Sequence, residues 1–162
     1  ILDLPPTIGK GFDMIWMSPP CKNFSRALTR GPRDLESATK IVKHCLEIIK
    51  QSKPKFWVLE NPYSGLLPQQ DFMQEFDYTV ASYCHYGLPY RKHTVFYNNF
   101  DLKLKRCCND CDSVVKVAGR WRNKSYAQKG TTCWDKTCYS TEQLYRIPEP
   151  LLESLYSQIF PN

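Results

Sequence analysis

The 162-residue chain contains no apolar stretch long enough to cross a bilayer, and its N-terminus lacks the charged region and apolar run of a secretory signal. These absences argue against a membrane or secreted protein. No internal repeat and no low-complexity segment is present, so neither a repeat architecture nor a biased tail is predicted. We expect a soluble, monomeric, intracellular protein without a membrane partner, in the cytoplasm, or in the nucleus if its source is eukaryotic or viral.

Acidic residues are the scarcer charged class. The chain has 16 Asp and Glu against 22 Lys and Arg, which gives a formal net charge of +6 and a pI near 8.9. Such an excess suits a polyanionic partner such as nucleic acid, because each neutralised phosphate releases condensed counterions. The 14% aromatic content strengthens this interpretation. Length and the 42% hydrophobic content indicate one compact unit with room for a small appended lobe.

The eight cysteines are unevenly spread. Three of them, Cys21, Cys45 and Cys84, are scattered through periodic segments, whereas five crowd between Cys107 and Cys138. This distribution favours reduced thiols plus a local metal site over the disulfide framework of a secreted scaffold.

A strand, loop, helix, strand pattern is predicted for the first third of the chain. The apolar run Met14 to Met17 ends at Ser-Pro-Pro and reads as a buried strand. Asp34 is a good N-cap for a helix with apolar residues at helical spacing, which Pro54 closes. A second strand, Phe56 to Leu59, follows. This order implies a right-handed crossover and a parallel sheet, and hence an α/β fold.

Two further strands are expected, Tyr78 to Tyr86 and Thr94 to Tyr97. After about residue 100 the composition changes: Cys, Lys, Arg and Gly become frequent, and the apolar residues show no clear periodicity. The last residues look like a Pro-started amphipathic helix that packs back on the core. We therefore divide the chain into a core of residues 1–100, a small Cys-rich irregular lobe of residues 101–142, and a C-terminal helix of residues 143–162.

Cys21 and Glu60 are each expected just past the carboxyl end of a strand, where open α/β sheets place their ligands. A thiolate adds well to electron-poor carbon, and a partly desolvated carboxyl stabilises the charge that such an addition creates. An arbitrary cysteine is more often a packing residue. Here, however, Pro19 and Pro20 place Cys21 on a stiff loop, since prolines continue neither helix nor strand.

Three motifs in this order resemble those of C5-cytosine methyltransferases. Ser18-Pro-Pro-Cys-Lys-Asn-Phe-Ser25 resembles the family's Pro-Pro-Cys-x-x-Phe-Ser motif, and Glu60-Asn-Pro62 looks like its Glu-Asn-Val motif. The segment Tyr86-Gly-Leu-Pro-Tyr-Arg-Lys-His-Thr94 is similar to Tyr-Gly-x-Pro-Gln-x-Arg-x-Arg, and closer to a variant in phage-like and viral members. The resemblance covers about residues 1 to 100. It implies a partial Rossmann-like, S-adenosylmethionine-dependent methyltransferase sheet.

The resemblance implies that Cys21 attacks C6 of a flipped cytosine in DNA, that Glu60 contacts N3 and the exocyclic amine, and that S-adenosylmethionine supplies the methyl group. The loop Lys22 to Arg33 matches the segment that closes over DNA, and a solvated basic loop is the alternative. Its proposed nucleic-acid contacts are Ser25, Arg26, Arg30 and Arg33.

The sequence departs from the family in two places. Thr94 stands where an arginine is expected at the cytosine O2, so Arg91 or Lys92 supplies the positive charge, or the site is weakened. The family's Phe-x-Gly-x-Gly cofactor loop is not found, and Ile1 aligns just after its adenine-contacting Asp. We therefore expect a fragment of low activity whose remaining cofactor wall comprises Pro20, Ile41 and Ile1.

The Cys-rich lobe matches the family's target-recognition region by position. Cys108 and Cys111 have the spacing of a zinc half-site, with Cys133 and Cys138 as the other pair and Cys107 as an alternative ligand. Zinc, free thiols and disulfides all stay open. In the same lobe, Arg120 and Arg122 flank a tryptophan, a combination that suits nucleic-acid backbone contact with stacking, or simply a basic loop.

Rival functions differ in what they require of Cys21. An amino-methyltransferase carries an aromatic residue after its Pro-Pro, and chemistry at an exocyclic amine needs no cysteine. A tRNA cytosine-5 methyltransferase shares the motifs, so only the nucleic acid that forms the adduct separates it from a DNA enzyme. A non-catalytic nucleic-acid-binding zinc module would keep its binding after Cys21→Ser.

Overall fold

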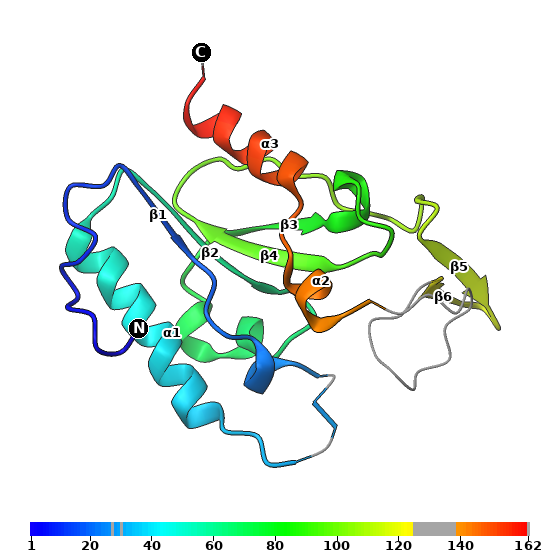
Figure 1. Cartoon of the computed structure of the whole chain (residues 1–162), viewed down its shortest axis with the longest axis horizontal. Helices are drawn as coiled ribbons and strands as arrows, with labels where there is room; N and C mark the ends of the chain where they lie inside the picture. The colour runs from blue at the N-terminus through cyan, green and yellow to red at the C-terminus, as the bar shows by residue number, and fades with distance from the viewer. Residues whose placement is uncertain (27, 30, 125–138, 162) are drawn as a thin grey trace. The chain divides into compact units, whose positions relative to one another are not determined.

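The computed structural model describes the chain except Ala27, Arg30, residues 125–138 and Asn162 (Figure 1). It divides into two compact units. The first comprises residues 1–79 and 94–103, and the second comprises residues 80–93 and 104–162. The described helices are α1 (Leu35–Ser52), α2 (Thr141–Tyr145) and α3 (Glu149–Ile159), with 3-10 helices η1 (Lys22–Phe24), η2 (Leu67–Gln69), η3 (Asp71–Met73) and η4 (Tyr83–Tyr86). The strands are β1 (Met14–Met17), β2 (Phe56–Pro62), β3 (Tyr78–Ser82), β4 (His93–Asn98), β5 (Val114–Val117) and β6 (Arg120–Asn123).

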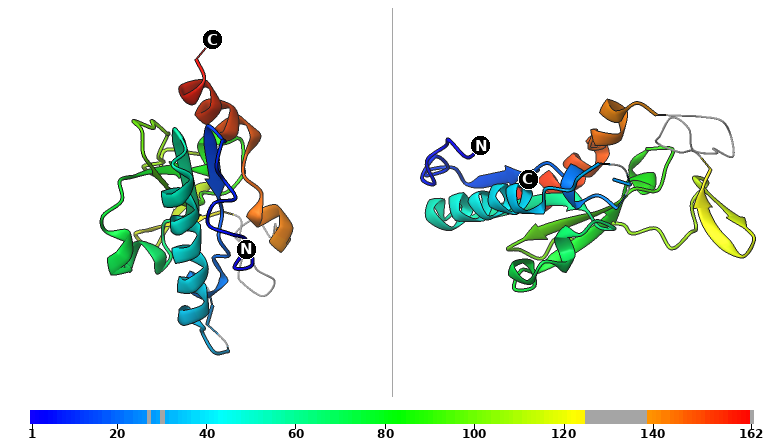
Figure 2. Two further views of the ribbon diagram at one scale, coloured as in Figure 1. Left: turned by 90° about the vertical axis from the view of Figure 1, so that its left-hand side faces the viewer. Right: turned by 90° about the horizontal axis from the view of Figure 1, so that it is seen from below.

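The predicted crossover from β1 through α1 to β2 is confirmed. The Asp34 carboxylate accepts a hydrogen bond from the Ser37 amide at 2.9 Å and so caps α1. The helix ends at Lys53, whose φ of 50° is left-handed, one residue before Pro54. β1 and β2 pair in parallel, with Met17 opposite Leu59. The helix runs alongside this pair in both further views (Figure 2).

The four-stranded sheet has the order β1-β2-β4-β3 and is mixed, since β4 pairs antiparallel with β2. The α/β class is confirmed. The second strand is longer than predicted: it continues through Glu60 and Asn61 to Pro62, because β4 supplies partners as far as Thr94. Glu60 thus lies within the end of a strand and not past it.

The segment expected as one strand from Tyr78 to Tyr86 is two elements. β3 stops at Ser82, and η4 follows until Gly87, which has a φ of 88°. Aromatic residues favour strands, so residues 83–86 look extended from propensity alone. The backbone turns there because the Tyr83 amide donates to the Lys92 carbonyl, a contact that local sequence does not reveal.

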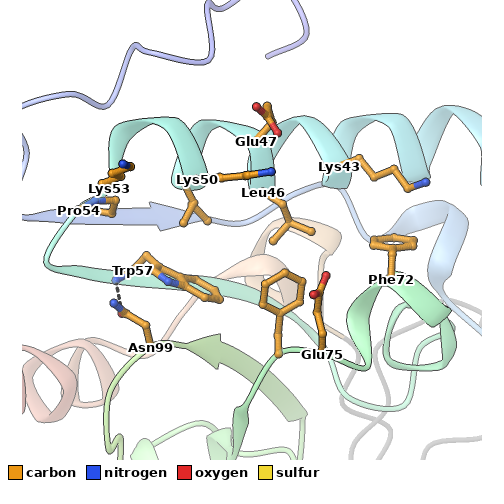
Figure 3. A pocket seen from close by; sticks show the side chains of 12 residues that line it. Lys43, Leu46, Glu47, Lys50, Lys53, Pro54, Trp57, Phe72, Glu75 and Asn99 are labelled. Carbon is orange, nitrogen blue, oxygen red and sulfur yellow. Dashed lines mark hydrogen bonds between the residues drawn. The ribbon is translucent and has the colours of Figure 1, made fainter.

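The core of the first unit lies between α1 and the sheet. Alternate residues of β2 and β4, namely Trp57, Leu59, Val95 and Tyr97, face Val42, Cys45 and Ile48 of the helix. On the same side, a groove of about 660 Å³ opens between α1 and Trp57, Phe72 and Phe76, with Lys43 at its rim (Figure 3). Neither Cys21 nor Glu60 lines it.

The second unit contains a hairpin where an irregular lobe was expected. β5 and β6 pair antiparallel across a two-residue turn, Ala118 and Gly119, both with positive φ. The predicted C-terminal helix is confirmed as α3, which follows Pro148, has Pro150 in its first turn and contacts η4. None of the helices in the described part of the chain has the length and hydropathy that crossing a membrane requires.

Candidate active site

Cys21 stands at the start of η1, four residues after β1. Its side chain is half-buried and is not part of a disulfide. The Phe24 amide donates to the Cys21 carbonyl at 3.0 Å, which closes a single turn directly after Pro20. The predicted stiff loop is therefore observed: the thiol projects from a short turn and not from a core element.

Glu60 is a buried acid inside the sheet. Only 8% of its surface is exposed, and its backbone pairs with Phe96 of β4. Because strand side chains alternate, Glu60 faces away from the core beneath α1 and shares its side of the sheet with Trp16 and Phe96, whose rings meet edge to face at 6.0 Å. Two aromatic rings therefore lie on the same side of the sheet as the carboxyl.

Asn61 connects the strand that carries Glu60 to the loop that carries Cys21. Its side-chain amide donates to the Pro19 carbonyl at 3.1 Å, and the residue is only 1% exposed. Since β1 and β2 are parallel neighbours, the Pro-Pro-Cys loop and the end of β2 meet at the same edge of the sheet. The hydrogen bond holds them together there. Sequence analysis did not identify this role, although an amide directly after Glu60 was visible.

Gly65 provides a second connection between these loops. A Cβ atom at Gly65 would lie 3.1 Å from the Pro62 carbonyl oxygen and 3.2 Å from the Phe24 carbonyl oxygen. The neighbouring Leu66 amide donates to the same Phe24 oxygen at 2.8 Å. The backbone after the Glu-bearing strand therefore packs directly against the turn that carries Cys21, and a side chain at Gly65 would require these carbonyls to shift by a few tenths of an ångström.

Two buried polar atoms beside Glu60 have no hydrogen-bond partner among the described residues. They are Oδ1 of Asn61 and Oγ1 of Thr94, which belong to adjoining strands since Thr94 pairs with Pro62. Buried polar atoms are normally satisfied. Because side chains alternate along a strand, Thr94 shares the face of Glu60, whereas Asn61 lies on the opposite face. The Thr94 hydroxyl is therefore the unsatisfied group that a polar ligand beside Glu60 could engage.

The basic segment after η4 makes contacts within the second unit. Lys92 donates to the Leu144 carbonyl at 3.0 Å and lies over the Tyr83 ring, while the Arg91 side chain hydrogen-bonds to Asn109. Burial, together with Arg91 and Arg106, lowers the pKa of His93 to about 4. His93 is thus neutral at pH 7, which leaves Arg91 and Lys92 as the predicted sources of charge.

The loop after Cys21 is held by Arg33. Its guanidinium donates to the Asn23 carbonyl at 2.7 Å and to the Leu28 carbonyl at 3.2 Å. Arg33 was predicted to contact a phosphate. In this structure its guanidinium instead hydrogen-bonds to the backbone of its own loop. Arg26 is exposed and Ser25 is half-buried, whereas Arg30 lies outside the described residues.

Arg120 and Arg122 are exposed on β6, two residues apart and therefore on one side of the hairpin. The intervening Trp121 is 45% exposed and lies beneath the Lys116 ammonium. The Asn123 side chain accepts from the Arg91 amide at 3.3 Å, so the hairpin is anchored to the basic segment. The role of these arginines in DNA contact stays a prediction.

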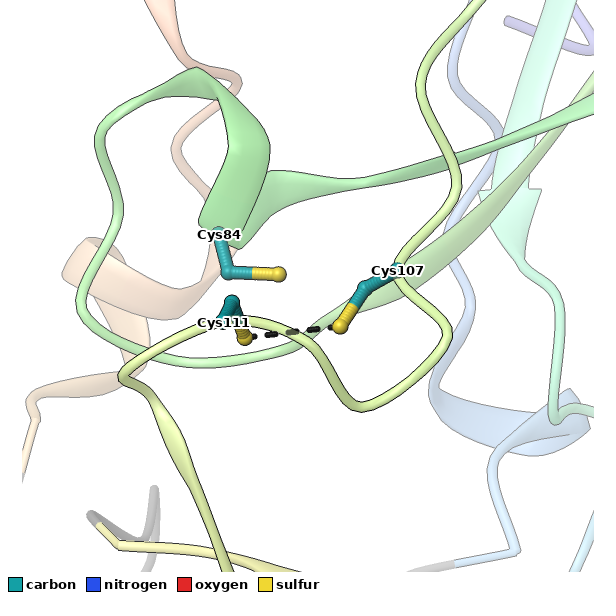
Figure 4. A group of neighbouring side chains, drawn as sticks. All are labelled: Cys84, Cys107 and Cys111. Carbon is teal, nitrogen blue, oxygen red and sulfur yellow. Dashed lines mark hydrogen bonds between the residues drawn. The ribbon is translucent and has the colours of Figure 1, made fainter.

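The cysteines group differently from the predicted metal site. Thiols of Cys84, Cys107 and Cys111 point toward one another, whereas Cys108 is exposed and outside the group (Figure 4). Cys133 and Cys138 lie outside the described residues. Asn109, with a left-handed φ of 70°, reverses the chain so that Cys107 and Cys111 converge. Cys84 was missed because it is distant in sequence.

The three residues predicted to line a cofactor pocket all belong to the first unit. Pro20 is exposed next to Cys21, Ile41 is half-buried against the core, and Ile1 is 47% exposed. The position of Pro20, at the edge where open α/β sheets bind ligands, suits one wall of a pocket beside the thiol.

Comparisons with known proteins point in one direction. The sequence model of the family described as C-5 cytosine-specific DNA methylase matches residues 3–105. The chain is also 28% identical over 177 aligned positions to the probable DNA (cytosine-5)-methyltransferase of Frog virus 3 (isolate Goorha). That alignment covers 94% of this chain and 77% of the viral protein.

Proposed function

The chain belongs to the C-5 cytosine-specific DNA methylase family, and from this premise we propose that it methylates C5 of cytosine in DNA through a covalent adduct to Cys21. The hydrogen bond from Asn61 to Pro19 carries the proposal. It joins the loop of the nucleophile to the strand of the acid, so that both groups act on one ring. The parallel β1 and β2 pair and the strand order support a partial Rossmann-like sheet.

In the proposed mechanism, the Cys21 thiolate forms a bond to C6 of the target cytosine. The electron pair of the C5–C6 bond moves toward N3, where the Glu60 carboxyl supplies a hydrogen bond or proton. Glu60 is only 8% exposed, and this burial strengthens that interaction. Once C5 carries the transferred methyl group, loss of the C5 proton to solvent expels sulfur as thiolate and restores the C5–C6 double bond.

S-adenosylmethionine, when bound, supplies the methyl group for C5. Pro20 would hold it next to the thiol, with Ile41 and Ile1 as further walls. The unsatisfied Thr94 hydroxyl fits a polar ligand on the Glu60 side of this edge of the sheet. The target cytosine has to leave the base stack to reach a buried acid, so base flipping is part of the proposal.

The test is covalent trapping on DNA that contains 5-fluorocytosine, with S-adenosylmethionine present. Fluorine stands where the C5 proton would be and cannot be removed by a base, so the Cys21 adduct accumulates and withstands denaturing electrophoresis. Cys21→Ser gives no adduct and still binds DNA, while Cys108→Ser, a change of an exposed thiol, traps normally. If the chain traps fluorinated RNA and not fluorinated DNA, its substrate is RNA. If the chain binds nucleic acid but forms no adduct, it is a non-catalytic nucleic-acid-binding module.

A further inference from the structure

Three thiols in the second unit form a cluster that the proposed methyl transfer does not use. Cys84 comes from η4, and Cys107 and Cys111 come from the loop before β5. Their sulfur atoms all lie within 4.8 Å of one another (Figure 4). The cluster joins two segments that are more than twenty residues apart in sequence.

The spacing of the sulfurs matches a tetrahedral metal. Zinc binds thiolate at about 2.3 Å, which places two sulfurs of one tetrahedron roughly 3.8 Å apart. The Cys107 and Cys111 sulfurs are 3.4 Å apart, and Cys84 is within reach of both. A single disulfide would leave the third thiol unpaired, whereas one zinc ion engages all three.

The loop is already shaped to hold the ligands. The Asn109 amide donates to the Cys107 sulfur at 3.3 Å, and the Cys107 amide donates to the Ser82 hydroxyl at 2.8 Å. An amide that donates to a ligand sulfur, as the Asn109 amide does, stabilises the thiolate. The Arg91 guanidinium, bonded to Asn109, adds positive charge near a site that three thiolates would make negative.

His85 lies near one member of the cluster, Cys107, but does not group with Cys84 and Cys111. One of its ring nitrogens lies within 4.8 Å of the Cys107 sulfur and of the Asp110 carboxylate. The Nε2 atom of His85 is 3.6 Å from Oδ1 of Asp110. A carboxylate beside a histidine ligand orients the ring and fixes its tautomer, an arrangement common around zinc.

We propose that Cys84, Cys107 and Cys111 bind a structural zinc ion, with the His85 ring moving closer to supply the fourth ligand and Asp110 orienting that ring. Thiolate and imidazole ligands in a closed four-ligand set favour zinc over hard cations such as magnesium. The ion would fasten η4 to the loop that leads into the β5–β6 hairpin, and so hold the hairpin that carries Arg120 and Arg122. This role is independent of the chemistry at Cys21.

The first measurement is the zinc content of the full chain, purified under reducing conditions with zinc and then freed of excess metal. We expect about one zinc per chain. Cys84→Ser, Cys107→Ser and Cys111→Ser each lose it, whereas Cys108→Ser, one residue from a ligand, retains it. Asp110→Asn retains zinc with an affinity lowered roughly 10- to 100-fold. Equal loss in Cys108→Ser and Cys111→Ser would overturn the assignment.

A second measurement needs no variant. Thiol alkylation of the wild-type chain, followed by mass spectrometry, compares the rate at each cysteine with and without zinc. Zinc slows the reaction at Cys84, Cys107 and Cys111 and leaves Cys108 unchanged. Equal rates in both samples would contradict a zinc site even if the serine variants fail to fold. Retention of zinc in His85→Ala, with loss in Cys133→Ser or Cys138→Ser, would overturn the assignment of His85.

Discussion

Glu60 is a buried carboxyl near the end of β2, a position that suits an acid that acts on a developing charge. We expect Glu60→Gln to lower methyl transfer by on the order of a hundredfold or more, with a much smaller effect on DNA binding. The control is Glu36→Gln, since Glu36 is exposed and pairs only with Lys40 at the surface. Single-turnover methylation and a binding titration measure the two effects. Parallel losses in both would make Glu60 a structural residue.

Asn61 is a positioning residue, because it acts on the reaction through the loop of Cys21. Asn61→Ala removes a buried hydrogen bond and leaves the Pro19 carbonyl unsatisfied, which costs about 1–3 kcal/mol in the free energy of unfolding. We expect a lower turnover as well, as the Cys21 loop loses its attachment to β2.

Asn99→Ala is the matched control for Asn61→Ala. Asn99 also joins segments within the first unit, accepting from the Trp57 amide at 2.9 Å and donating to the Lys55 carbonyl at 3.1 Å. It should lower stability to a similar degree and spare turnover of the folded protein. Chemical denaturation and initial rates, measured on both variants, test the contrast. Equal turnover in Asn61→Ala and Asn99→Ala would show that Asn61 is not a positioning residue.

The site depends on close contact between two segments, the loop after β2 and the turn that carries Cys21. Gly65→Ala places a Cβ against the Pro62 and Phe24 carbonyls, and backbone atoms yield less easily than side-chain ends. We expect the loops to separate, with loss of stability of about 1–3 kcal/mol, as in overpacked cores, and slower adduct formation. Ser64→Ala, next to it, should change neither. Thermal unfolding and the rate of trapping on 5-fluorocytosine DNA measure the effects, and an unchanged trapping rate would show that the contact is not needed.

The hairpin illustrates why some elements escape sequence patterns. Its strands are four residues each, and the first three residues of β6 are exposed, so no alternation of buried and exposed residues marks it. The turn, Ala-Gly, lacks the Asn-Gly signature that identifies such hairpins. By contrast α1, with eighteen residues and a clear apolar face, was predicted with Asp34 as its N-cap and an end before Pro54, and both are confirmed.

At the scale of the whole molecule, the net charge of +6 predicts DNA binding that weakens as salt rises. If Arg120 and Arg122 each neutralise a phosphate, the double alanine variant lowers the slope of log affinity against log salt by about 1.8. The control is Lys40→Ala with Lys50→Ala, which removes the same charge from the exposed face of α1. Binding isotherms at several salt concentrations measure these slopes. Equal slopes for the two double variants would indicate a general electrostatic attraction to DNA, without a specific contact from the hairpin.

The sequence alone determined the features that depend on neighbours along the chain. Apolar spacing and caps defined β1, α1 and β2, and the Pro-Pro-Cys and Glu-Asn-Pro motifs at their ends identified Cys21 and Glu60. Tertiary structure decided what depends on distant partners: the antiparallel pairing of β4 that draws Glu60 into the sheet, the attachment of Asn61 to Pro19, the contact of Gly65 with Phe24, and the meeting of Cys84 with Cys107 and Cys111. Local propensities are encoded residue by residue. Contacts between remote segments arise only when the core brings those segments together, so no spacing rule predicts them.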